Sequence, residues 1–498
     1  MDHKNEDKDE DLEPVAGLSS ASAIIALYLD KAKDPVSDST SDSSSAALQP
    51  CIHPVFTHQC FENEVIPGYT PFPDETEKAF QLAFQQRKGK ENENVPHSSF
   101  LEPYKSNASQ YLRINVSIVP SCAYTNNISM KKKPIAETST LSGQKRKATD
   151  ENESSHEDTG NDDSTIIKML SKALPPMKAP ESIQLDKDGY LLEPIGESVA
   201  SYNVASKDFI VTLASGKTPH INEYHQSIQN LALFFIENAD GVDLTSDEGG
   251  GKWVVMYLFQ KHSDDNVVRY SLAGYMTLFL FFSPFKKPVG GNIVRICQAL
   301  ILPPYQRQGH GKRLMDACYQ YAKGDFDTIL KEQSNIVEVN VEDPAPGFVQ
   351  LRVAVDYHLL SKYKEEGDCS ICEKYFKDGE YLLMNDADAT NIGVQLRITK
   401  TQVQIAYEIC KLSEKTKYLQ KREDNIEAAD KEEIEKKFRL MVKKRLNSLD
   451  KEDIGACATK IEKQAMLTKI YDETIAGYKK ILKYTERSGV NRNAVNVD

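Results

Sequence analysis

The most informative segment of the chain is Gln298-Ala-Leu-Ile-Leu-Pro-Pro-Tyr-Gln-Arg-Gln-Gly-His-Gly-Lys-Arg-Leu-Met315. Its apolar run, Ala299 to Leu302, predicts a buried strand that ends at the two following prolines. A loop with two glycines follows at Gln306 to Gly311, and apolar residues at helical spacing begin after it. A strand, a glycine-containing loop and a helix N-terminus in this order are typical of a diphosphate site, because free backbone N–H groups point at the anion.

The spacing of the two glycines excludes two common diphosphate sites. A Walker loop needs Ser or Thr after its Gly-Lys pair, and here Arg313 follows Lys312. The dinucleotide fingerprint needs a third glycine, and Leu314 stands at that position. The remaining pattern, Gln-x-x-Gly-x-Gly, resembles the coenzyme A pyrophosphate loop of the GNAT superfamily of N-acetyltransferases.

The amino-acid sequence around the loop resembles that of one family in this superfamily, the catalytic subunits of type B histone acetyltransferases. Other segments resemble the same family at matching places, namely Phe56-Thr-His-Gln-Cys-Phe61 with Glu62-Asn-Glu64, Phe234-Phe-Ile-Glu237, Gly274-Tyr-Met-Thr277, Val341-Glu-Asp-Pro344 and Phe438 to Asn447. The resemblance covers residues 51–118 and 175–485, and it implies acetyl-CoA as the co-substrate.

The composition favours an intracellular enzyme with a basic partner. The chain has 498 residues, which allows more than one domain, and its charged N-terminus and short apolar stretches predict neither a signal peptide nor a membrane span. Nine scattered cysteines favour reduced thiols of the cytosol or nucleus. The net charge of −13 argues against direct nucleic-acid binding and suits a basic protein partner.

We expect a mixed α/β acetyltransferase sheet with an N-terminal α/β substrate-binding region and a C-terminal helical bundle. Residues 1–50 are acidic and Ser-rich and are expected to be disordered, with a short helix at Ala23 to Leu29. The further divisions are a substrate-binding region at 51–220, with a polar disordered insertion at 123–163, an acetyltransferase domain at 221–394, the bundle at 395–485 and a tail at 486–498.

Hydrophobic periodicity predicts the elements of the central domain. A core helix is expected over Ile221 to Asn238, followed by strands over Trp253 to Gln260 and Val267 to Phe282. Residues Ile336 to Glu342 alternate between apolar and polar, and a crossover helix links them to the Ala299 strand. These two strands should therefore be parallel neighbours. Three apolar helix faces after about residue 395 predict a bundle of roughly three helices.

Acetyl transfer to a lysine needs a group that removes a proton, because free Lys has a pKa near ~10.4. Glu342 ends a strand parallel to the cofactor strand and Asp343 follows it, at the sheet edge where ligands of α/β proteins bind. The alternative is that both are ordinary turn residues at a strand end. Glu237 by itself would be a solvated helix edge, and only the resemblance implies a catalytic role for it.

The resemblance also implies the ligand contacts. Main-chain groups of Ala299, Leu300 and Ile301 would follow the pantetheine arm of acetyl-CoA. The pyrophosphate would be bound by Gln306, Arg307, Gln308, Gly309, His310, Gly311 and Lys312, with His310 as a loop residue rather than a base. The substrate tail would be bound by Glu62, Asn63, Glu64, Phe279, Leu280 and Phe281, and the acidic pair Asp74 and Glu75 adds further candidates.

Three further segments qualify this interpretation. Ala345-Pro346-Gly347 departs from the family, whose members carry polar residues there, one of which can bond the cofactor. Cys369-Ser-Ile-Cys372 has half the spacing of a zinc site but no second Cys/His pair nearby, so no metal is expected. Lys131–Lys133 and Lys145–Lys147 resemble a bipartite nuclear localisation signal, the alternative being a solvated basic patch.

The sequence predicts a lysine acetyltransferase, and the resemblance implies that its substrate is the tail of newly made free histone H4, with H3 present. The resemblance implies a WD-repeat histone-binding subunit as partner, location in nucleus and cytoplasm, and neither direct nucleic-acid nor membrane binding. One alternative is an acetyltransferase for another protein or a small amine. The other is a non-catalytic histone-binding scaffold, which would have no need to keep Glu237, Glu342 and the intact loop.

Overall fold

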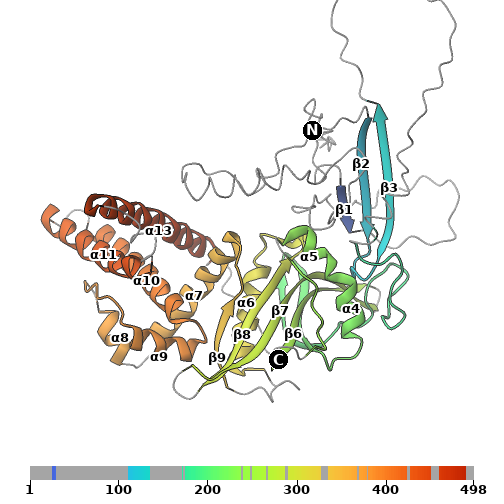
Figure 1. Ribbon diagram of the computed structural model, residues 1–498, viewed down its shortest axis with the longest axis horizontal. Helices are drawn as coiled ribbons and strands as arrows, with labels where there is room; N and C mark the ends of the chain where they lie inside the picture. The colour runs from blue at the N-terminus through green and yellow to red at the C-terminus, as the bar shows by residue number, and fades with distance from the viewer. Residues whose placement is uncertain are drawn as a thin grey trace, which may run out of the picture. The chain divides into compact units, whose positions relative to one another are not determined.

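The structure is a computed structural model in which the chain folds as two compact units (Figure 1). Unit 1 comprises Met1–Glu193, His220–Asp243 and Lys261–Leu272, and unit 2 comprises Pro194–Pro219, Leu244–Gln260 and Ala273–Asp498. The residues that the structure describes are 25–29, 110–134, 171, 174–236, 239–246, 250–264, 267–286, 290–326, 335–366, 370–377, 379–422, 427–449 and 459–488.

Unit 1 contains a three-stranded sheet in the order β1-β2-β3, made of β1 (Ile25–Leu29), β2 (Gln110–Ile118) and β3 (Thr125–Pro134). β1 pairs parallel with β2, and β2 pairs antiparallel with β3. Two expectations are corrected here. The segment around Ile25 is a strand rather than a helix in a disordered tail, and the polar segment from residue 123 begins with a strand. Both segments are ordered by main-chain pairing with β2, which hydrophobic periodicity does not report.

The second sheet has six strands in the order β4-β5-β6-β7-β8-β9, with bounds β4 (Glu197–Val204), β5 (Lys207–Ser215), β6 (Lys252–Asp264), β7 (Val267–Ser283), β8 (Gly291–Ile301) and β9 (Ile336–Val341). β4 and β5, like β7 and β8, pair antiparallel, whereas β8 and β9 pair parallel. The expected parallel pair is confirmed. β6 runs past Gln260 to Asp264, so its connection to β7 is shorter than predicted.

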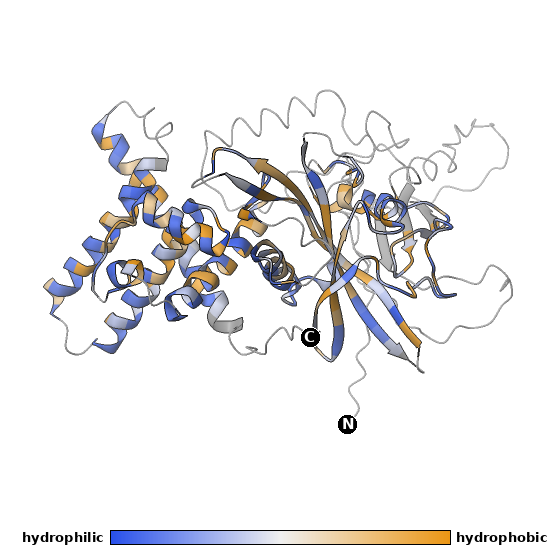
Figure 2. Ribbon diagram, turned by 90° about the horizontal axis from the view of Figure 1, so that it is seen from below, coloured by the Kyte–Doolittle hydropathy of each residue, from blue (hydrophilic) through white to orange (hydrophobic). Residues whose placement is uncertain are grey.

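The middle strands of this sheet form the core of the molecule. Val254 to Phe259 on β6 are fully buried at every position, which explains why this strand reads as a continuous apolar run rather than an alternation. Figure 2 shows hydrophobic stretches, in orange, along the strands of this sheet and hydrophilic residues, in blue, toward several strand ends. The mixed sheet and the helices around it confirm the predicted α/β class.

The predicted single helix over Ile221 to Asn238 is two helices, α4 (Ile221–Ile228) and α5 (Asn230–Phe235). They are separated at Gln229, whose side-chain oxygen accepts the N–H of Val242 at 2.7 Å. The chain leaves α5 in an extended conformation at Ile236. No proline or glycine marks this interruption, so it has no local signal in the sequence.

Helices α6 (His310–Lys323) and α7 (Pro346–Glu366) fix β9 through buried polar contacts. Tyr319 of α6 donates to Asp356 of α7 at 2.6 Å, and Arg352 donates to the Val339 carbonyl of β9 at 3.0 Å. Burial raises the pKa of Asp356 to about 6, while the nearby Arg352 opposes the rise. α7 is thereby attached both to α6 and to the outer edge of β9.

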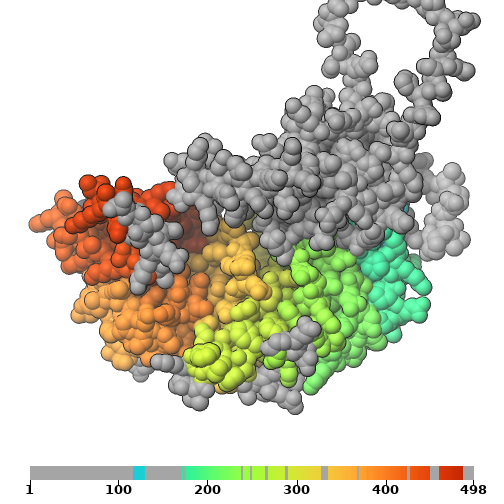
Figure 3. Space-filling model, viewed as in Figure 1, coloured from blue at the N-terminus to red at the C-terminus, as the bar shows by residue number. Residues whose placement is uncertain are grey.

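The rest of unit 2 is helical, with α8 (Ser370–Tyr375), α9 (Asp386–Leu396), α10 (Lys400–Lys421), α11 (Ala428–Leu449) and α13 (Lys460–Ser488). The three helices predicted for the bundle are α10, α11 and α13. The helical part starts earlier than residue 395, however, because α10 packs on both α7 and α9. Figure 3 shows these helices, in orange to red, joined without a break to the yellow region of β8 and α6.

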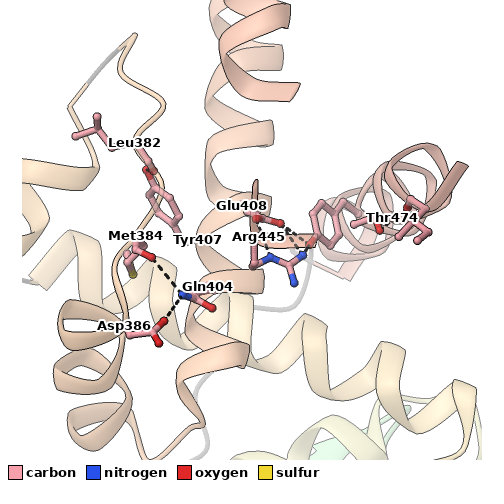
Figure 4. Close-up of polar contacts among 10 residues, drawn as sticks. Leu382, Met384, Asp386, Gln404, Tyr407, Glu408, Arg445 and Thr474 are labelled. Atoms are coloured by element: carbon pink, nitrogen blue, oxygen red, sulfur yellow. Dashed lines mark hydrogen bonds and ion pairs between the residues drawn. The ribbon is translucent and has the colours of Figure 1, made fainter. Parts of the chain in front are cut away.

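A buried polar cluster joins the three bundle helices (Figure 4). Arg445 of α11 donates twice to Glu408 of α10, at 2.8 and 2.9 Å, and Tyr478 of α13 donates to Glu408 at 2.7 Å. In the basic segment Lys443-Lys-Arg445, the arginine is only 6% exposed and belongs to this buried cluster. Among the described helices, none is long and apolar enough to span a membrane.

Candidate active site

The two parallel strands β8 and β9 separate at the site. Their pairing runs from Asn292 opposite Ile336 to Ile296 opposite Val341, and the Glu342 N–H donates to the Ile296 carbonyl at 3.0 Å. β8 then continues to Ile301, paired on its other side with β7. In the described part of the chain no strand pairs with the β9-facing side of these last β8 residues. We call this side of Ala299–Ile301 the open edge.

A β-bulge lies where the strands separate. Thr277 of β7 is opposite Gln298 and Leu278 is opposite Ile296, so Cys297 is an extra residue in β8. Such a bulge bends a strand and changes which way the following backbone groups point. Here it coincides with the end of the β8–β9 pairing.

The backbone groups on the open edge follow from the pairing with β7. The Leu302 N–H donates to Ala273, so by alternation Leu300 also pairs with β7, and Ala299 and Ile301 face the open edge. Gln306 donates its side-chain N–H to the Ile301 carbonyl at 2.8 Å. The backbone N–H and carbonyl of Ala299 and the N–H of Ile301 therefore point at the space where a linear ligand with amide groups would bind. Of the three predicted contacts, Leu300 alone has its main chain turned away.

The loop after β8 leads directly into the N-terminus of α6. A short 3-10 turn, η4 (Pro303–Tyr305), is followed by Gly309, which takes φ 87° immediately before the helix. The first helical hydrogen bond runs from Arg313 N–H to the Gly309 carbonyl, and within the described residues no side chain caps this end. The N–H groups of His310, Gly311 and Lys312 thus remain at the helix start, which is suited to an anion.

The side chain of His310 points away from this anion site. It is 1% exposed, its Nδ1 lies 2.8 Å from the hydroxyl of Tyr202 on β4, and its ring contacts Phe209 on β5 at 4.3 Å between centroids. Burial, and secondarily the charge of Arg313, lowers the pKa of His310 to about 4. His310 is therefore neutral at pH 7 and holds α6 on the β4–β5 hairpin, so only its backbone can serve the ligand.

Glu342 lies at the end of β9, where the two strands part. Its carboxylate is half exposed, and its Oε1 lies 3.9 Å from Nη1 of Arg295 on β8. Burial, followed by a hydrogen bond to Glu342, raises the pKa of the Cys297 thiol to about 12, so this thiol stays protonated. Asp343 is exposed with φ 33°, and the chain enters α7 at Pro346.

One face of the sheet leads to Glu342 through an aromatic row, Trp253, Phe279 and Phe281. The ring of Phe279 lies 4.9 Å from that of Trp253 and 5.9 Å from that of Phe281. All three side chains are partly exposed, whereas Leu280 is 5% exposed and faces the core. Of the predicted residues Phe279 to Phe281, the two aromatic ones share this face and Leu280 does not.

Trp253 was missed by sequence reasoning, although it is the only tryptophan of the chain and a partly exposed aromatic residue near the start of a strand. Its place beside Phe279 arises from strand pairing, which the sequence does not display.

The predicted residues Glu62, Asn63, Glu64 and Glu237 lie outside the described residues. No group of three or more His, Cys, Asp or Glu in the described part of the chain could hold a metal ion.

Comparison with known protein families agrees with this geometry. Residues 138–237 match the family described as the N-terminus of histone acetyl transferase HAT1, and residues 232–337 match the acetyltransferase (GNAT) family. The second match contains the open edge, the glycine loop and α6. The fold and the site therefore define a GNAT acetyltransferase domain.

Relatives from several organisms carry one name, histone acetyltransferase type B catalytic subunit. A Dictyostelium discoideum protein is 30% identical over 38% of this chain and 38% of its own length. A Cryptococcus neoformans protein is 25% identical over 64% of this chain and 76% of its own, and the Homo sapiens protein is 26% identical over 44% and 48%. The chain is thus similar to the type B histone acetyltransferase catalytic subunits over these stretches, and it contains a GNAT acetyltransferase domain.

Several of these matches span less than two thirds of the relative: 38% of the Dictyostelium protein and 48% of the human one. Among solved structures, an aminoglycoside acetyltransferase from an uncultured soil metagenomic sample aligns over 32% of this chain and 90% of its own, with 16% identity and a TM-score of 0.19.

Proposed function

We propose that the protein transfers the acetyl group of acetyl-CoA to lysine side chains in the N-terminal tail of free histone H4. The observation that carries this proposal is the combination, in one site, of an open strand edge, an anion-binding helix start and a carboxylate where β8 and β9 part. Acetyl-CoA supplies the activated acetyl thioester. The residues of the chain bind it, orient it and remove the proton of the incoming lysine.

The open edge and the loop suit the two ends of acetyl-CoA. Backbone groups of Ala299 and Ile301 can hydrogen-bond the amides of a pantetheine arm in the manner of a neighbouring strand. The N–H groups of His310, Gly311 and Lys312 can bind the pyrophosphate. This pairing would direct the thioester end toward the strand separation, where Glu342 lies.

Glu342 is the proposed proton acceptor, with Asp343 and Glu237 as further candidates. Lysine is charged at neutral pH, and only its neutral amine can attack the thioester carbon. The partly exposed carboxylate of Glu342 can take the proton directly or through one water molecule. The new N–C bond then forms as the C–S bond breaks, and the proton that the attacking nitrogen loses neutralises the leaving thiolate, which departs as the thiol of coenzyme A.

The aromatic row offers a surface for the aliphatic stem of a lysine. Trp253, Phe279 and Phe281 are apolar but partly exposed, so they can contact methylene groups while the amine approaches Glu342. The net charge of −13 suits a basic tail. Because the relatives are named for histones, a histone tail is the substrate class we propose.

Mass spectrometry of free histone H4 incubated with the purified protein and acetyl-CoA tests this function. We expect acetyl groups on tail lysines and none when the Glu342→Gln variant replaces the wild type at equal time. Acetylation of spermidine or another small amine in preference to H4 would favour the alternative activity. Binding of H4 without any transfer would favour the scaffold.

We also propose a WD-repeat histone-binding partner, histone H3 in the bound substrate, and location in nucleus and cytoplasm. The relatives are named as subunits, which supports an assembly, and the partner class comes from the family resemblance.

Of the two basic clusters that resemble a nuclear localisation signal, Lys131–Lys133 lies in β3, while Lys145–Lys147 is outside the described residues. Alanine replacement of Lys145-Arg-Lys147 should move a fluorescent fusion toward the cytoplasm, and an unchanged distribution would contradict the signal.

A further inference from the structure

Arg295 lies on the sheet face that leads to Glu342. It is opposite Phe279 on β7 and opposite Asn340 on β9, and directly opposite residues of neighbouring strands point to the same face. Its guanidinium carbon lies 4.9 Å from the centre of the Phe281 ring, and its Nη1 lies 3.9 Å from Oε1 of Glu342. The side chain thus joins the aromatic row to the carboxylate.

The folded state has little need of this ion pair. The side chains of Arg295 and Glu342 are 39% and 50% exposed, and ion pairs exposed to this degree contribute little to stability. A glutamate at that exposure can otherwise adopt several rotamers, which would spread its carboxylate over different positions. The main effect of Arg295 is therefore on where the carboxylate lies.

Two consecutive residues of β8 act on Glu342. Arg295 attracts its carboxylate, and the Ile296 carbonyl accepts its backbone N–H at 3.0 Å. The thiol of the next residue, Cys297, donates to the Arg295 carbonyl at 3.6 Å. Since β8 also provides the open edge, one strand positions both the acetyl donor and the group that would remove the lysine proton.

We propose that Arg295 is a positioning residue for acetyl transfer, holding the Glu342 carboxylate where β8 and β9 part. This rests on the proposed function, in which Glu342 accepts the lysine proton. The planar guanidinium can stack on Phe281 and direct an N–H group at the carboxylate simultaneously, whereas a lysine ammonium lacks this planar geometry.

A double-mutant cycle on kcat tests the proposal, with Arg295→Met, Glu342→Gln and the double variant. Methionine keeps an apolar stem against Phe281 but removes the charge. We expect Arg295→Met to lower kcat about tenfold or more, because small displacements of reacting groups are costly, while the KM for acetyl-CoA changes less than about twofold. In the Glu342→Gln background the same change should have no further effect, since no proton acceptor remains to be positioned.

Two other variants separate positioning from general effects. Arg295→Lys should recover part of kcat, because the charge returns without the planar group. Lys286→Met is the matched control. It removes another ion pair of a β9 carboxylate, between Lys286 in the connection after β7 and Glu338 at 2.6 Å, and should leave kcat unchanged. Thermal midpoints of all variants should stay close to that of the wild type.

Rates are measured on tail peptides of each core histone, so that the cycle does not depend on H4 being the substrate. The positioning role would be overturned if the losses of the two single variants multiplied in the double variant, or if Arg295→Met kept full kcat. In either case a low kcat of Glu342→Gln would still support the proposed function. Full activity of Glu342→Gln would instead remove Glu342 as proton acceptor and this proposal with it. No acetylation of any peptide by the wild type would reject the proposed function and the proposal that rests on it.

Discussion

Gly309 and Gly324 stand at the two ends of α6 with nearly the same backbone conformation. Their φ angles are 87° and 78°, and a Cβ added to either would meet no atom within 4 Å. In both cases the cost of a side chain comes from the left-handed conformation rather than from a clash. Only Gly309, however, directly precedes the N–H groups proposed to bind pyrophosphate.

This pair of glycines makes the ligand assignment testable. Gly309→Ala and Gly324→Ala should each lower the free energy of unfolding by about 1 kcal/mol. Only Gly309→Ala should weaken acetyl-CoA binding, by about tenfold or more, because the loop loses the geometry that aims the N–H groups. Calorimetric titration measures this, and equal affinities for the two variants would contradict the diphosphate site.

The role of the Glu342 carboxylate can be tested by a substitution of nearly equal size. Glu342→Gln keeps the size of the side chain but cannot accept a proton, so kcat should fall by about 10²–10⁴-fold with acetyl-CoA affinity unchanged. Raising the pH should restore part of the rate, since more lysine is then neutral. Asp343→Asn and Asp343→Asn with Glu342→Gln are assayed alongside it. If all three variants keep full activity, neither carboxylate is the proton acceptor.

At the scale of elements, α6 is attached to the β4–β5 hairpin through His310. The histidine is buried against Tyr202 and Phe209, and its pKa of about 4 lies below the ordinary value of 6.5. As the pH falls through 6.5, His310 becomes protonated in the unfolded chain. In the folded chain it stays neutral until the pH reaches about 4. Folding stability contributed by this site is therefore present at neutral pH and is lost between about pH 6.5 and 4.

The free energy of unfolding should therefore depend on pH through His310. Lowering the pH from 7 to 5 should reduce the free energy of unfolding by up to about 2 kcal/mol through His310 alone. His310→Gln, which cannot titrate, should show a correspondingly smaller loss in urea unfolding at the two pH values. A pH dependence identical in the two proteins would show that His310 does not cause it.

Elements with a local signal were predictable from the sequence. β8, the glycine loop, α6 and β9 were predictable because apolar runs, two glycines and an alternation each lie within a few residues. β3 was not, since Asn126-Asn-Ile-Ser-Met130 has no such alternation and is held by main-chain pairing with β2. Trp253 and Arg295 belong to the site only through the pairing of the four strands β6 to β9, which no local pattern reports.

At the scale of the whole molecule, the C-terminal helices depend on the charged cluster of Glu408, Arg445 and Tyr478. Burial raises the pKa of Glu408, whereas its bonds from Arg445 and Tyr478 lower it and favour the charged form. Arg445→Met leaves a buried carboxylate without its main partner and should cost about 3–5 kcal/mol of stability.

The compensating variant tests whether charge or shape matters in this cluster. Glu408→Leu with Arg445→Met removes both charges and should recover most of the loss, because an apolar pair needs no desolvation of ions. Thermal unfolding of the single and double variants measures this. A double variant no more stable than Arg445→Met would mean that packing, rather than the unpaired carboxylate, causes the loss.

The alternation of backbone groups along the end of β8 also has a consequence for amide hydrogen exchange. In the ligand-free protein the amides of Ala299 and Ile301 face the open edge and should exchange with solvent deuterium quickly, while that of Leu300 is protected by β7. Acetyl-CoA would then slow exchange at every second residue rather than across a continuous segment. Such a two-residue period, resolved by NMR, would be the signature of a small molecule that behaves as an additional β-strand.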